Sequence, residues 1–104
     1  MDKQIKIEQK AVKVLKEIFD PEIPVNIYDL GLIYKIDFDN NSNLNIDMTL
    51  TAPNCPMADD LVMQVNQKLS EIVGVNLVNI NLTFDPPWDK NMLSEEAKLE
   101  LGLL

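Results

Sequence analysis

Cys55 is the side chain best suited to nucleophilic or metal-binding chemistry, because it is the single cysteine of a sequence without histidine. Pro56 after it fits the first position of a helix, so we expect Cys55 at or beside an N-cap. Unpaired N–H groups there favour a thiolate, whereas Asp59 and Asp60 in the same turn disfavour it. The ionisation of the thiol is therefore left open. A free cysteine is usually a small buried apolar group, but a loop bounded by prolines favours a functional role.

The same two counts exclude several kinds of site. Without histidine there is no Ser-His-Asp or Cys-His catalytic pair and no histidine-bound metal. With one cysteine there is no internal disulfide, no CxxC pair and no self-contained zinc or iron–sulfur site. Any metal or cluster bound by Cys55 must take its other ligands from a second subunit, a partner protein or a small thiol. A carboxylate from Asp20 or Glu22 is a further source.

Four other residues are candidates for chemistry or binding. Asp20 and Glu22 offer two nearby carboxylates, although a solvated acidic turn at a helix end explains the same pattern. Thr51 precedes the cysteine loop on the polar face of a predicted strand, where β-propensity alone also explains it. Trp88 follows two prolines at a strand end and fits either a core position or an interface anchor.

Composition predicts one cytoplasmic domain. The chain has 104 residues with 46% hydrophobic and 25% charged, typical of a globular protein, and its length allows a single domain over residues 1–104. Nine lysines against 17 acidic residues give a net charge of −8, which argues against nucleic acid as a partner. No apolar run is long enough to span a membrane, and we expect no signal peptide at the start.

Hydrophobic periodicity predicts the elements that must position these residues. In chain order they are a helix over residues 3–19, strands over 32–39 and 44–51, a helix over 58–72, a strand over 78–84 and a short helix from the Ser94 N-cap to Gly102. Pro21 should stop the first helix near Asp20. An Asn-rich link joins the first two strands, which predicts an antiparallel hairpin. Gly74 lies where a residue following the second helix is expected.

This order, α-β-β-α-β-α, predicts an α+β fold. Each strand has one apolar face, so the helices should pack on one face of a three-stranded sheet. The expected architecture is a two-layer sandwich.

Four motifs occur in register along the chain. They are Asp20-Pro21-Glu22-Ile23-Pro24, Asp29-Leu30-Gly31-Leu32-Ile33-Tyr34, Thr51-Ala52-Pro53-Asn54-Cys55-Pro56 and Phe84-Asp85-Pro86-Pro87-Trp88. Together they make the sequence resemble the SufT/YitW/PaaD-like family of metal–sulfur cluster biosynthesis proteins, which includes the MIP-eighteen-type targeting factors. The resemblance runs from about Val12 to Gly102.

The resemblance implies a compact α/β domain that is an accessory factor in iron–sulfur cluster assembly or delivery, and not an enzyme. The characteristic cysteine of the family falls on Cys55, its acidic loop on Asp20 and Glu22, and its threonine on Thr51, with Pro56 after the cysteine. The chain lacks the C-terminal cysteine cluster of PaaD-type members and the fused P-loop ATPase of the carrier variant.

Three hypotheses follow. In the leading one, Cys55 binds a transient iron–sulfur cluster or iron, or docks a partner, and no cofactor is bound stably by this chain alone. Scaffold and client proteins are the implied partners, and a homodimer sharing the metal at Cys55 is a further form. In the second, the protein is an adaptor that binds scaffold and client proteins through Trp88 and the acidic surface, and the thiol takes no part. The third is a thiol enzyme. The sequence disfavours it, because no histidine base and no second, resolving cysteine are present.

Overall fold

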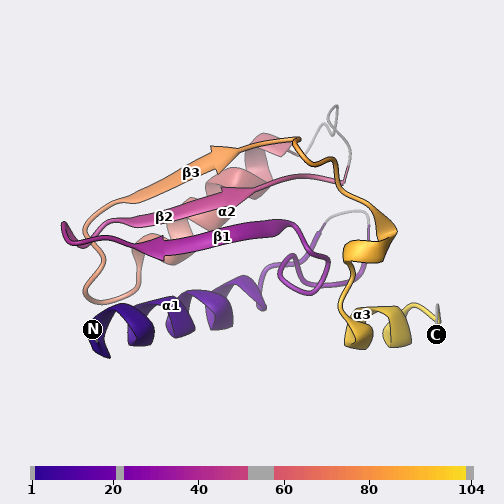
Figure 1. The fold of residues 1–104 in the computed structure, drawn as a ribbon, viewed down its shortest axis with the longest axis horizontal. Helices are drawn as coiled ribbons and strands as arrows, with labels where there is room; N and C mark the ends of the chain where they lie inside the picture. Colours follow the sequence, from indigo (N-terminus) through magenta and orange to yellow (C-terminus); the bar gives the residue numbers. More distant parts are fainter. Residues whose placement is uncertain (1, 21–22, 52–57, 103–104) are drawn as a thin grey trace.

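The computed structural model describes residues 2–20, 23–51 and 58–102 and contains one sheet and three α-helices (Figure 1). The elements are α1 (Asp2–Leu15), β1 (Ile33–Phe38), β2 (Leu44–Met48), α2 (Ala58–Ser70), β3 (Val78–Leu82), the 3₁₀ helix η1 (Lys90–Met92) and α3 (Glu95–Glu100). The predicted element order and the α+β class are confirmed.

The three strands form a mixed sheet in the order β1-β2-β3. β1 and β2 pair antiparallel, as the Asn-rich link predicts, and Ile36 lies opposite Ile46. β3 pairs parallel to β2, with Ile80 opposite Ile46. Parallel neighbours need a crossover connection, and α2 lies within it.

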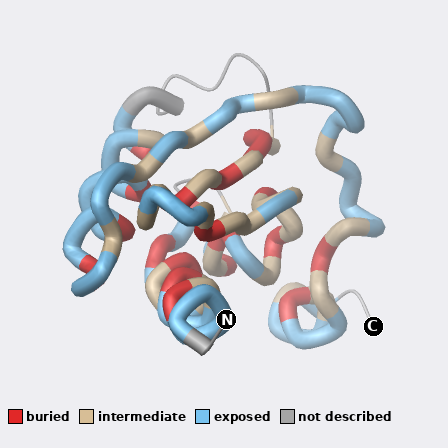
Figure 2. The backbone as a smooth tube through the Cα atoms, turned by 60° about the vertical axis from the view of Figure 1, so that its left-hand side comes forward, coloured by how far each residue is buried: buried red, intermediate tan, exposed pale blue. Residues whose placement is uncertain are grey.

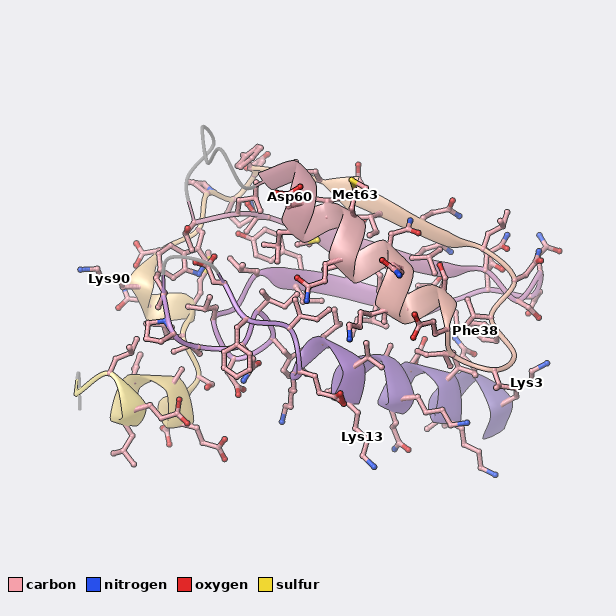
Figure 3. All side chains as sticks on the ribbon, turned by 180° about the vertical axis from the view of Figure 1, so that it is seen from behind. Lys3, Lys13, Phe38, Asp60, Met63 and Lys90 are labelled. Carbon is pink, nitrogen blue, oxygen red and sulfur yellow. The ribbon has the colours of Figure 1, made fainter. Side chains whose placement is uncertain are left out.

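The core lies between one face of this sheet and the two long helices. Leu44, Ile46 and Met48 of the central strand are fully buried there. The buried residues that α1 and α2 add to the same cluster are Ile7, Ala11, Leu15, Leu61, Val65 and Leu69. Seen from behind, α2 crosses the sheet with α1 beside it (Figure 3). The opposite face carries Asn45, Asp47 and exposed Asn79, and the outer strand β3 has the fewest buried positions (Figure 2).

The first helix is shorter than predicted. It ends at Leu15, whereas the spacing predicts a helix up to residue 19. The Ile27 N–H donates to the Ile18 carbonyl at 2.8 Å, and Phe19 forms an antiparallel bridge with Asn26. Pairing with a later segment thus takes over the backbone groups that a helix would use.

The third strand and second helix also end early. β3 stops at Leu82, and Leu82 and Phe84 are 40% and 38% exposed, although their alternation predicts burial. α2 ends at Ser70 and continues as a turn, and Gly74 has the positive φ of 100° expected after a helix.

One backbone group on the outer edge of each outer strand is occupied by a helix side chain. Glu8 of α1 accepts a hydrogen bond from the Phe38 N–H of β1 at 3.1 Å. Asn66 of α2 donates its side-chain amide to the Val78 carbonyl of β3 at 3.3 Å. Each helix is therefore fixed to the strand edge beside it.

The last helix begins and ends as predicted. The Ser94 Oγ accepts a hydrogen bond from the Ala97 N–H at 3.1 Å, and Gly102 has a φ of 73°. The Ser94 N–H donates to the Asp29 carbonyl at 2.8 Å, and Leu93 and Ala97 are buried. α3 thus packs against the segment that precedes β1, beyond the end of the sheet (Figure 1).

Candidate functional site

The described segments directly before β1, after β2 and after β3 lie at the end of the sheet where β2 and β3 finish and β1 begins (Figure 1). The last row of that end pairs Ile33, Met48 and Leu82 across the strands. Hydrogen bonds continue past it, from the Thr49 N–H to the Leu32 carbonyl and from the Thr83 N–H to the Met48 carbonyl, each at 2.8 Å. The strand pairing therefore fixes the chain up to residue 49, directly before the cysteine motif.

The connection from β2 to α2 carries the predicted thiol. Leu50 is buried and Thr51 is half-buried at its start, and the described chain resumes at Ala58. Cys55 and Pro56 lie outside the described residues. Covalent connectivity alone keeps Cys55 within about 14 Å of the Cα of Thr51, at ~3.5 Å per residue. The connection that contains Cys55 therefore starts from this end of the sheet.

Thr49 is a candidate that the sequence does not single out. Its side chain is fully buried, and its Oγ1 has no hydrogen-bond partner among the described residues. A buried hydroxyl without a partner costs free energy, so this one is an exception to be explained. Alternation places Thr49 on the polar face of a strand, and nothing local in the sequence indicates that this position is covered.

Asp20 is a structural residue of the turn after α1. It is only 7% exposed, and its Oδ1 accepts a hydrogen bond from the Ile23 N–H at 3.0 Å. The Asp20 N–H lies 3.3 Å from the Val25 carbonyl, to which it donates. These bonds support the turn interpretation of the acidic motif. Glu22 lies outside the described residues.

Trp88 is held against the segment before β1. It is half-buried beside the core, and its Nε1–H donates to the Leu30 carbonyl at 2.7 Å. Nearby, the Tyr34 hydroxyl donates to the Pro86 carbonyl at 2.7 Å. The indole donor is therefore used within the fold, and binding of a partner by Trp88 stays a prediction.

Gly31 makes the close approach of this C-terminal segment possible. Its φ is 84°, and a Cβ built there would collide with the Met92 carbonyl oxygen. Glycine adopts such a φ without steric cost and leaves the space that Met92 needs. The Asp-Leu-Gly motif thus serves to lay residues 88–97 against the end of the sheet.

The Asn26–Asp29 turn completes this frame. The Asn26 side chain accepts from the Asp29 N–H at 2.9 Å and donates to the Asp29 carboxylate at 2.8 Å. This closed pair shapes the segment whose carbonyls at residues 29 and 30 hold Ser94 and Trp88. Two of the four sequence motifs are therefore joined by hydrogen bonds from the Trp88 and Tyr34 side chains to the Leu30 and Pro86 carbonyls.

The described side chains do not form a metal site by themselves. Within residues 2–20, 23–51 and 58–102, no group of three or more cysteine, histidine or acidic side chains is arranged to hold a metal ion. None of the described helices is long and apolar enough to cross a membrane.

One carboxyl group with a shifted pKa lies far from this site. The pKa of Asp39 is lowered, because its carboxylate accepts hydrogen bonds from the Asn43 N–H first and from the Asn45 side chain second. Asp39 belongs to the hairpin turn at the opposite end of the sheet. Its shift therefore reflects turn formation and not chemistry near Cys55.

A protein-family model matches most of this chain. The model, described as an iron–sulfur cluster assembly protein, matches residues 4–82. The matched range contains three of the four motifs, including the cysteine motif, and stops before the Phe84–Trp88 motif.

Individual proteins agree with the family match. An Fe–S protein maturation auxiliary factor of Porphyromonas gingivalis is 51% identical over 96% of this chain and 95% of its own length. The Fe–S protein maturation auxiliary factor SufT of Staphylococcus aureus is 40% identical over 83% of this chain and 98% of its own. The crystal structure of a domain of unknown function from Bacillus anthracis superposes with a TM-score of 0.89 at 38% identity, covering 98% of this chain and 97% of that one.

Proposed function

This chain belongs to the iron–sulfur cluster assembly protein family, and on that basis we propose that it is an accessory factor that uses Cys55 to hand iron–sulfur cargo to client proteins. The thiol acts as a transient ligand of a cluster or of iron, or as the contact that docks the donor or recipient. Scaffold and client proteins are its partners, and it acts in the cytoplasm without catalysing a reaction of its own.

The position of the cysteine motif supports this proposal most directly. The single thiol lies in the connection that leaves β2 and enters α2, and the β2 side of that connection is fixed by the hydrogen bond between Thr49 and Leu32. A base fixed by strand pairing gives this connection a defined starting point, and a binding site needs supporting residues that hold their position. The thiolate is also the protein ligand that iron–sulfur clusters use most.

Incomplete ligation suits a delivery role. Clusters usually take four protein ligands, and this chain offers one thiol. A cargo held by one thiolate and completed by another molecule leaves readily when a client offers more ligands. The completing molecule is a partner protein, a small thiol or a second copy of this chain sharing its own Cys55.

The acidic motif takes a supporting role in this proposal. Asp20 shapes the turn after α1 through its bond to the Ile23 N–H, so its carboxylate serves loop geometry. Glu22 remains the carboxylate proposed to reach the cargo. Thr51, which is half-buried at the start of the cysteine motif, and Pro56 are proposed to line the site.

The adaptor function is the second candidate. Exposed apolar surface near the end of β3, at Leu82 and Phe84, is the observation that favours it. Trp88 is less suited to anchor a partner, because its indole N–H is already bound to the Leu30 carbonyl. In an adaptor, the partners bind to this surface and the thiol takes no part.

Genetic complementation tests the thiol. A strain lacking its own homologue receives the wild type, Cys55→Ala or Cys55→Ser, and iron–sulfur enzyme activity is measured relative to enzyme protein. Both variants should leave activity at the level of the empty strain, while thermal unfolding stays close to wild type. Full activity with Cys55→Ala would overturn the role of the thiol and favour the adaptor.

A displaced thiol provides the matched control. Ser70 is exposed at the far end of α2, so the double variant Cys55→Ala/Ser70→Cys restores one cysteine at the wrong place. It should not restore activity. Anaerobic purification with iron, sulfide and mass measurements then shows whether cargo is bound at Cys55 and whether two copies share it.

A further inference from the structure

Positive charge is concentrated in one helix of this acidic protein. Residues 1–16 hold five of the nine lysines and two of the 17 acidic residues, a formal net charge of +3. Residues 17–104 hold the other four lysines and 15 acidic residues, a net charge of −11. The molecule therefore presents a basic helix on an acidic body.

Four of these lysines form one stripe along α1. Spacings of three and four residues place them on the same side of the helix. We call this surface the lysine face: Lys3, Lys6, Lys10 and Lys13. All four side chains are exposed, and three of them border a shallow hollow together with Gln9. Figure 3 shows Lys3 and Lys13 at separate points along α1. The Lys3 side chain also approaches Gly74 in the connection after α2, at 3.8 Å from a Cβ built there.

The lysine face has no partner in the described part of the chain. No carboxylate among residues 2–20, 23–51 and 58–102 forms an ion pair with any of its four ammonium groups. Glu8 of the same helix instead accepts from the Phe38 N–H of β1. The fifth lysine, Lys16, lies over the Tyr28 ring at 5.5 Å. Four charges of one sign thus stay available to another molecule.

Of these lysines, only Lys13, in the last turn of α1, has a charge that complements the helix dipole. Positive charge in the first half of a helix opposes its dipole, as at Lys3 and Lys6. Like charges three or four residues apart repel each other. A helix selected for its own stability would carry acidic residues at such positions. The stripe is therefore better explained by something that binds to it.

We propose that the lysine face is the docking surface for an acidic patch of a partner protein. The inference rests on the proposed function, in which that partner donates or receives the cargo. A protein is favoured over nucleic acid or an anionic membrane, because the −11 charge of residues 17–104 repels an extended polyanion. A compact acidic patch can meet the lysine face alone.

Docking by charge suits a transient exchange. Complementary charges accelerate encounter and orient two proteins more than they slow dissociation. The lysine face belongs to α1, whereas the thiol lies in the connection between β2 and α2. The proposed docking surface and the thiol therefore belong to different segments of the chain.

A binding experiment with matched variants tests the proposal. The probe is a fluorescein-labelled glutamate peptide of about six residues, which spans ~20 Å when extended and so is short enough to contact the lysine face alone. Its anisotropy is followed at low and at physiological salt. The test variant is Lys3→Gln/Lys6→Gln/Lys10→Gln/Lys13→Gln. The matched control changes the same number of lysines outside α1, as Lys35→Gln/Lys68→Gln/Lys90→Gln/Lys98→Gln, so both variants have the same net charge.

The two variants should differ clearly. Loss of the lysine face should weaken peptide binding about tenfold, from four exposed pairs of modest strength, whereas the control should stay within about twofold. Equal weakening in both, or no binding at low salt, would overturn the proposal. Tighter binding to phosphatidylglycerol vesicles or to RNA than to the peptide would overturn it as well. Thermal unfolding of both variants checks that they fold.

Complementation separates this inference from the proposed function. The lysine-face variant should lower iron–sulfur enzyme activity several-fold and the control variant should not. Cys55→Ala should bind the peptide like the wild type. If Cys55→Ala supports full activity while the lysine face still binds the peptide, the thiol role fails and the docking surface stands. Full activity of the lysine-face variant would overturn the docking role alone.

Discussion

The two ends of the sheet are built in different ways. At the hairpin end, Asp39 accepts hydrogen bonds from the N–H groups of Asn41 and Asn43, all within five residues of the chain. At the cysteine end, Trp88 donates to the Leu30 carbonyl across 58 positions of sequence, and Tyr34 donates to the Pro86 carbonyl across 52. The hairpin end is centred on a local turn, which a distant segment joins through the bond from the Asn76 N–H to the Ser42 carbonyl at 2.7 Å. The cysteine end is held mainly by bonds between distant segments.

The difference explains where function can reside. A local turn forms from its own residues and tolerates change, since few other parts depend on it. A junction of separate segments holds several side chains in fixed relation, as a site requires. Substitutions at the cysteine end should therefore cost more free energy of unfolding than substitutions at the hairpin end.

The largest effect is expected at Gly31. A Cβ there meets the Met92 carbonyl and requires a positive φ, so Gly31→Ala should lower the free energy of unfolding by about 3 kcal/mol. Gly102→Ala is the matched control, because Gly102 also has a positive φ but nothing within 4 Å of a Cβ. The control should lose about 1 kcal/mol in urea unfolding. Equal losses of unfolding free energy in the two variants would show that the positive φ, and not the contact with Met92, causes the destabilisation.

A smaller effect is expected at Trp88. Trp88→Phe keeps an aromatic ring but leaves the Leu30 carbonyl without its donor, which should lower the free energy of unfolding by about 1 to 2 kcal/mol. Circular dichroism in urea measures the change. Stability equal to the wild type would mean that this bond does not hold the C-terminal segment.

Thr49→Val should change stability in the opposite direction. It removes a buried hydroxyl that has no partner among the described residues, and the free energy of unfolding should rise by about 1 kcal/mol. Activity in the complementation assay is measured on the same variant. A loss of stability would instead show that the hydroxyl is bound by a residue outside the described ranges.

The smallest effect is expected at the hairpin end. The lowered pKa of Asp39 means that its carboxylate stabilises the fold above its usual pKa of 3.8, and that this contribution disappears as the pH falls through the lower folded value. Asp39→Asn keeps an acceptor oxygen and removes the titration. Urea unfolding at pH 7 and pH 3 should therefore show a slightly weaker acid dependence in the variant. An unchanged acid dependence would contradict this assignment.

Local patterns predict most of the fold. Alternation identifies the hairpin and the buried face of β2, and serine and glycine identify the limits of α3. The predicted end of α1 is wrong, because Phe19 forms an antiparallel bridge with Asn26. The local sequence pattern does not reveal such a tertiary contact. The exposure of Leu82 and Phe84 is missed for the same reason, since alternation does not reveal what covers a strand.

The site is less predictable than the fold. Sequence motifs select Asp20 and Trp88, but only three-dimensional contacts show that the Asp20 carboxylate closes a turn and that the indole N–H is used internally. Thr49 gives no signal at all, because burial of its hydroxyl depends on segments distant in the chain. The roles of Cys55 and Glu22 stay predictions.

The helix side chains that bind the edges of the two outer strands affect how other proteins can associate with this one. An open strand edge invites a neighbouring chain to add a further strand, which leads to aggregation. Glu8 and Asn66 each occupy one backbone group on such an edge and interrupt the row that an incoming strand would need. Strand addition is thereby disfavoured. A partner that binds must then use the side-chain surfaces of the protein, and it can leave without breaking a shared sheet.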